Sequence, residues 1–86
     1  GIDISAAYGA PVSVTGDGTV EKVAFTSTYG LSVDVRHTDH VTTRYAHLSK
    51  SHVKVGQQLA RGEVLGLIGA TGRATGPHLH YEIRIN

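Results

Sequence analysis

Two histidines flank one leucine near the end of the chain, at His78-Leu79-His80, and the residues that follow alternate between polar and apolar types. Such alternation has the period of a half-buried β-strand, whose successive side chains point to opposite faces. Both imidazoles are therefore expected on one strand face with Glu82 and Arg84, in front of an apolar face. Two imidazoles on one rigid face can serve a single site, as metal ligands or as proton-transfer groups.

A carboxylate and a third histidine extend this set. Asp3 lies between two isoleucines, and it is expected to project from the opposite face; by itself it is typical of a surface aspartate. His47 ends a predicted strand, where a rigid scaffold presents side chains near solvent, although a lone histidine there is more often a cap. Together, one carboxylate and three histidines can bind zinc, activate water and move protons.

Composition limits the alternatives. The 86 residues include six histidines, 11 glycines and no cysteine, so any metal must be held by histidine and carboxylate. The length predicts one small domain, and 40% hydrophobic residues predict a globular chain. A formal charge of +1 gives no case for nucleic acid binding. No apolar run approaches the ~18 residues of a membrane span.

Nearly every segment predicts β-structure. Strands are expected at residues 2–4, 11–15, 19–28, 31–37, 41–46, 53–56, 63–69 and from residue 78 onward. Residues 49–52 predict a single helical turn, and residues 71–76 form a glycine-rich loop before the His-Leu-His strand. The sequence therefore predicts an all-β fold: an antiparallel folded sheet or split barrel of short strands with tight glycine turns and little or no helix.

Seven segments carry a further signal, at residues 1–4, 9–12, 16–20, 29–30, 43–49, 53–57 and 69–82. The element Thr-Gly-x-x-Thr-Gly-Pro-His-Leu-His at residues 71–80 and the element Tyr-Ala-His-Leu at residues 45–48 are highly specific in combination. In these segments the chain resembles the lysostaphin/LytM-type family of zinc metallo-endopeptidases that act on bacterial peptidoglycan. The resemblance runs essentially from end to end and keeps the order of the motifs.

The resemblance implies a role for each matching residue. Asp3 and His80 match zinc ligands, and His78 and His47 match catalytic histidines. It implies that zinc-activated water attacks a peptide carbonyl in a cross-bridge or stem peptide of peptidoglycan. It also implies a place in the bacterial cell envelope, periplasmic or secreted.

One departure concerns the third zinc ligand. The family's His-x-x-x-Asp motif would place a histidine four residues before Asp3, which is two positions upstream of Gly1. We therefore interpret residues 1–86 as a single peptidase domain that is incomplete at its N-terminus. With only two of three protein ligands, zinc affinity is expected to fall sharply and the fragment to be inactive.

Other residues are candidates for supporting roles. Tyr45 shares strand parity with His47 and is a candidate for the substrate groove, as are Arg73 and Thr75 in the glycine-rich loop. Glu82 is expected to give a supporting hydrogen bond or ion pair. The remaining histidines, at 37, 40 and 52, are assigned no catalytic or ligand role.

Two alternatives stay open. A non-catalytic envelope module of the same fold could bind cell wall or activate a partner hydrolase, and the residue two positions before Gly1 would distinguish it from the enzyme. A lipoyl or biotinyl carrier is suggested by residues 53–65, but a carrier needs a lysine in a special hairpin context, and neither Lys22, Lys50 nor Lys54 has one.

Overall fold

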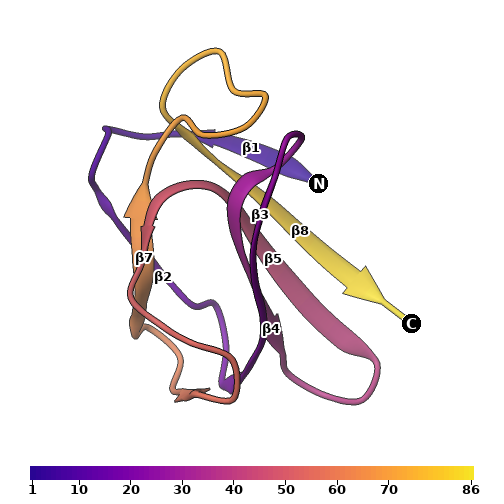
Figure 1. Ribbon diagram of the computed structural model, residues 1–86. Coiled ribbons are helices and arrows are strands. Elements are labelled where there is room, and N and C mark those ends of the chain that lie inside the picture. Colours follow the sequence, from indigo (N-terminus) through magenta and orange to yellow (C-terminus); the bar gives the residue numbers. More distant parts are fainter.

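The computed structural model describes residues 1–86 as a bent eight-stranded sheet without helices (Figure 1). The strands are β1 (Ile2–Ser5), β2 (Pro11–Ser13), β3 (Gly18–Thr26), β4 (Gly30–Arg36), β5 (Val41–Ser51), β6 (Gln58–Leu59), β7 (Val64–Ile68) and β8 (His78–Ile85). The predicted all-β class is confirmed. No helix long and apolar enough to cross a membrane is found.

Strand β5 pairs with three other strands, β4, β7 and β8. Every strand pair in the sheet is antiparallel. The main order is β1-β8-β5-β4-β3-β6, while β7 pairs with both β2 and β5. The first part of β5 lies between β4 and β8, and its last residues pair with β7. The sheet therefore changes partners along β5, and β2 and β7 stand apart from β1 and β8 in Figure 1.

Apolar side chains from most of the strands gather in one core. The core cluster consists of Val12, Val14, Val20, Val33, Val35, Tyr45, Leu48, Val53, Leu59, Leu65 and Ile68. The hydroxyl group of Tyr45 is hydrogen-bonded to Thr43 and Thr15, at 2.8 Å and 3.1 Å from their hydroxyl oxygens. No buried side-chain nitrogen or oxygen lacks a partner, which is the condition for burying polar atoms at low cost.

Two local predictions are wrong, and both lie after residue 48. The expected helical turn at residues 49–52 is instead the end of β5, because Lys50 and Ser51 pair with Leu67 and Gly66 of β7. The expected strand at residues 53–56 is not formed. This segment ends in a turn at Gly56, and the next strand is β6, which pairs with β3. At residues 49–52, pairing with a distant strand overrides the local pattern.

Two glycines lock the turn after β3 to the loop before β8. Both Gly30 (φ 63°) and Gly72 (φ 71°) have left-handed backbones. A Cβ on Gly30 would collide with the backbone of Thr71 and Gly72, and a Cβ on Gly72 would collide with the backbone of Gly30. The amide of Leu31 also donates to the hydroxyl oxygen of Thr71 over 3.1 Å. The two segments therefore hold each other in place.

We predict that Gly30→Ala lowers the free energy of unfolding much more than Gly56→Ala does. Both glycines have a positive φ, but a Cβ on Gly56 would meet nothing within 4 Å. Gly56→Ala should cost about 1 kcal/mol for its backbone alone, and Gly30→Ala should cost that plus the collision. Urea unfolding of the intact protein measures both, and equal losses would show that the backbone contact is unimportant.

Candidate metal centre

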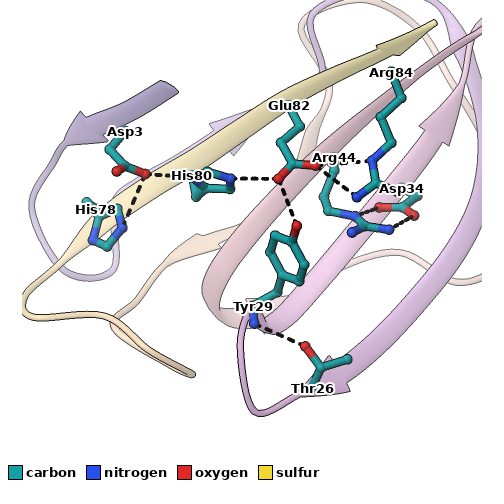
Figure 2. Close-up of polar contacts among 9 residues, drawn as sticks. All are labelled: Asp3, Thr26, Tyr29, Asp34, Arg44, His78, His80, Glu82 and Arg84. Atoms are coloured by element: carbon teal, nitrogen blue, oxygen red, sulfur yellow. Dashed lines mark hydrogen bonds and ion pairs between the residues drawn. The ribbon is translucent and has the colours of Figure 1, made fainter. Parts of the chain in front are cut away.

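Strand β8 presents its polar face as the alternation predicted. It lies between β1 and β5, with His80 directly opposite Asp3 on one side and Ala46 on the other. Figure 2 shows His78, His80 and Glu82 in a row along β8, with Asp3 reaching across from β1.

The Asp3 carboxylate faces two imidazoles. Its Oδ1 atom lies 2.6 Å from Nδ1 of His80 and 3.6 Å from Nε2 of His78. The exposed Asp3 side chain therefore brings one negative charge to the two histidines of the His-Leu-His triplet. The hydrogen bond with His80 is the main cause that lowers the pKa of Asp3 below its ordinary value.

His47 reaches the same cluster from β5 through an unusual backbone. It has φ 62°, the only positive φ outside glycine, and it lies between Tyr45 and Leu48, where the pairing of β5 with β4 shifts register. Its ring centroid is 4.7 Å from that of His78 and 6.0 Å from that of His80. The prediction that His47 ends its strand is wrong, because β5 continues through this kink to Ser51.

The outer nitrogens of His47 and His78 are anchored on backbone carbonyls. Nδ1 of His47 lies 2.6 Å from the carbonyl oxygen of Thr71, and Nδ1 of His78 lies 2.9 Å from that of Gly76. A carbonyl oxygen only accepts, so both Nδ1 atoms carry the proton. In the neutral rings, each Nε2 atom carries a lone pair, and that of His78 lies 3.6 Å from Oδ1 of Asp3.

His80 is held between two carboxylates. Besides the Asp3 contact at Nδ1, its Nε2 atom lies 2.8 Å from Oε2 of Glu82. Partial burial by itself would lower the pKa of His80, but the hydrogen bonds with Asp3 and Glu82 outweigh it and raise this pKa. Burial likewise opposes ionisation of Glu82, and hydrogen bonds from His80, Arg84 and Tyr29 overcome it and lower the pKa of Glu82 to about 2.

Two open cavities flank the imidazoles. One, of about 320 Å³, is lined by Arg73 and Tyr29 together with His47 and His80. The other, of about 300 Å³, is lined by Thr75 and the loop before β8, together with Asp3 and His78. Arg73 and Thr75, which sequence analysis associated with substrate, therefore line two different cavities beside the cluster.

Tyr45 does not line either cavity. Its side chain is completely buried in the core, where its ring packs against Tyr81 with centroids 5.4 Å apart. The sequence prediction assumed that Tyr45 and His47 share a strand face, as residues two apart do in a regular strand. The left-handed backbone of His47 breaks this alternation, so the two side chains project to different faces.

The 86 residues do not contain a complete metal site. No three histidine, aspartate or glutamate side chains are grouped so that they could hold a metal ion. The largest cavity, of about 540 Å³, is lined by Asp17, His37 and Glu63 and contains none of the clustered histidines. His37 is bound on both ring nitrogens, to the carbonyl oxygen of Asp17 and the hydroxyl of Thr43, and has a structural role there.

Sequence reasoning gave no site role to Tyr29 and Thr71. The Tyr29 hydroxyl donates to Glu82 over 3.0 Å, and the Tyr29 carbonyl oxygen accepts from the His47 amide over 2.8 Å. Thr71 acts on His47 through its backbone oxygen. The contact of Thr71 is made by its backbone, so no side-chain type in the sequence could indicate it. The only sequence feature that could have indicated a site role for Tyr29 is its position as a polar aromatic residue beside the turn glycine Gly30.

The fold and the cluster define an all-β protein with a histidine–carboxylate centre, the donor chemistry that metallohydrolases use. A family model described as Peptidase family M23 matches residues 1–86. The chain belongs to this family.

Named relatives agree with this assignment. The chain is 43% identical over 86 residues to the Vibrio cholerae protein named peptidoglycan DD-endopeptidase ShyC, covering 100% of this chain and 20% of that protein. It is 48% identical over 86 residues to the Neisseria meningitidis protein named DD-carboxypeptidase/endopeptidase Mpg, and the match covers 100% of this chain and 20% of that protein. The chain thus spans about a fifth of the length of these relatives.

Solved structures have the same fold. The catalytic domain of the antimicrobial peptidase lysostaphin from Staphylococcus simulans matches with a TM-score of 0.96 and 32% identity, over 100% of this chain and 66% of that chain. A structure described as a zinc containing peptidase from Vibrio cholerae matches with a TM-score of 0.94 and 46% identity, over 96% of this chain and 26% of that chain.

We predict that His47→Gly leaves the protein more stable than His47→Ala, by about 1 kcal/mol. Both variants lose the same imidazole and its bond to Thr71, but only glycine adopts φ 62° without cost. Urea unfolding of the two variants checks this difference. If the alanine variant were equally stable, the backbone at residue 47 would relax without its side chain, and the kink would not be imposed by its surroundings.

Proposed function

We propose that this chain forms most of the catalytic centre of a zinc-dependent endopeptidase that hydrolyses peptide bonds in bacterial peptidoglycan. One observation carries the proposal: Asp3, His47, His78 and His80 come from three strands and converge on one face of the sheet. Asp3 and His80 are proposed as two zinc ligands. A further ligand would come from outside residues 1–86, two positions before Gly1.

The donor set fits a divalent cation. Nδ1 of His80 points at the Asp3 carboxylate, while its Nε2 atom is occupied by Glu82. A cation that replaces the proton on Nδ1 would keep one imidazole nitrogen and one carboxylate oxygen as ligands, with Glu82 behind the ring. A carboxylate behind a ligating histidine is the usual outer partner in zinc sites.

The two remaining histidines are proposed as the catalytic pair. The Nδ1 protons of His47 and His78 are fixed on carbonyl oxygens, so their Nε2 atoms are free to take a proton from water and return one to the leaving amine. In protonated form, either ring can also stabilise negative charge that develops on the substrate carbonyl oxygen. A bound zinc ion would supply the Lewis acidity that lowers the pKa of water toward ~7.

The two cavities that border the cluster favour an extended peptide as substrate. Arg73 lines one cavity and Thr75 the other, so a peptide that crosses the imidazoles would contact both residues. We propose the peptide part of peptidoglycan, either a cross-bridge or a stem peptide, because this is the substrate in the relative's name, peptidoglycan DD-endopeptidase. The place of action would then be the cell envelope.

Substitutions should separate the proposed ligands from the catalytic pair. In the intact protein, His80→Ala should abolish zinc retention, as measured by elemental analysis. His78→Ala and His47→Gly should keep zinc but lower turnover by about 10²–10⁴-fold, the usual contribution of an acid–base group. Full zinc occupancy in His80→Ala, or unchanged turnover in the other two variants, would contradict these roles.

Digestion of purified peptidoglycan tests the function itself. The intact protein should release fragments whose masses identify new peptide ends, a chelator should stop their release, and added zinc should restore it. Cleavage that resists the chelator would exclude the zinc mechanism. Binding to peptidoglycan without any new peptide end would favour the non-catalytic envelope module.

A further inference from the structure

Glu82 has more partners than a surface carboxylate needs. Its Oε1 atom accepts two hydrogen bonds from Arg84, at 3.1 Å and 3.0 Å. Its Oε2 atom accepts from Nε2 of His80 over 2.8 Å and from the Tyr29 hydroxyl over 3.0 Å. The side chain is only 16% exposed. An ion pair with Arg84 alone would satisfy the charge, so the second oxygen and its two donors require another explanation.

The strand sets the distance between Glu82 and His80. Residues two apart on β8 share a face, and both side chains lie over the same side of the sheet (Figure 2). A glutamate at this spacing can reach the outer nitrogen of the imidazole without leaving its own strand. The contact therefore depends on a rigid element and not on a loop.

Tyr29 is itself fixed by two groups. Its amide donates to the hydroxyl oxygen of Thr26 over 3.0 Å, and its ring lies under the guanidinium of Arg44, 4.7 Å from the ring centroid. Arg44 is held in turn by two hydrogen bonds to Asp34, of 2.8 Å and 2.9 Å. The phenol is thus a preorganised donor aimed at Glu82, 53 residues away in the sequence.

We propose that Glu82, aimed by Tyr29 and Arg84, is a positioning residue that keeps the proton of His80 on Nε2 and thereby presents Nδ1 to the metal. This inference rests on the proposed function, since it takes His80 as a zinc ligand. A histidine without such a partner can turn or bind its proton on the other nitrogen, and both changes weaken ligation. The charge of Glu82 also makes the ring a stronger electron donor.

The expected effect is on zinc affinity. In the intact protein, Glu82→Ala should weaken zinc binding by about 10- to 100-fold, as measured by competition with a chelator of known affinity. Glu82→Gln should recover part of this loss, because an amide oxygen still accepts from Nε2. Tyr29→Phe should weaken binding by a smaller factor, and it should add nothing in the Glu82→Ala background, since Tyr29 acts through Glu82.

A second readout reports the proton position directly. The ¹⁵N chemical shifts of His80 in the zinc-loaded protein should show a protonated Nε2 and a metal-bound Nδ1 in the wild type, with broadened or mixed signals in Glu82→Ala. Glu21→Gln is the matched control, because Glu21 is exposed on β3 and far along the sheet from β8. It should leave affinity and shifts unchanged.

The outcomes separate this inference from the function on which it rests. If the wild type binds zinc and His80→Ala does not, but folded Glu82→Ala binds zinc as tightly as the wild type, the role of Glu82 is refuted and the zinc site stands. If Glu82→Ala does not fold, the other two variants decide. The role of Glu82 is refuted if both Glu82→Gln and Tyr29→Phe keep the zinc affinity and the His80 ¹⁵N chemical shifts of the wild type. If the wild type binds no zinc, the proposed function fails first.

Discussion

The register of β8 between β1 and β5 is the constraint on which the site depends. It sets Asp3 opposite His80 and places Ala46 on the far side, so that one carboxylate and two imidazoles share a face. Side chains alternate with a period of two, so a slip of one residue would turn the histidines into the core and the isoleucines toward the site. The partly buried Leu79 and Tyr81, which pack against the core from the apolar face of β8, therefore hold the site's residues in register.

The second requirement is a local departure from regular structure. Were β5 regular, His47 would project to the core face with Tyr45, and the cluster would lose its third imidazole. The kink at His47 has a cost of order 1–3 kcal/mol for a residue other than glycine. Hydrogen bonds to the carbonyl oxygens of Tyr29 and Thr71 hold it, so this cost is offset by contacts with both neighbouring loops.

These two features explain what could be predicted from the sequence. The alternation after His78 predicted the polar face of β8 correctly, because the periodicity of a single strand is local information. The face of Tyr45 was predicted wrongly, because a left-handed residue changes parity without any mark in the side-chain pattern. The end of β5 and the contact of Tyr29 with Glu82 depend on segments far apart in the chain, and no local pattern contains them.

The contact between Gly30 and Gly72 separates a fixed part of the site's border, at these two glycines, from a part that tolerates change, at Arg73 and Thr75. Gly30 and Gly72 cannot gain a side chain without displacing the facing backbone, which includes Thr71, the residue that holds the kinked histidine. Arg73 and Thr75 project beyond this junction and are exposed. Retargeting the chain to another peptide, by evolution or in the laboratory, should therefore proceed by exchanging the side chains of Arg73 and Thr75 while the carbonyl oxygen of Gly76, which holds His78, stays in place.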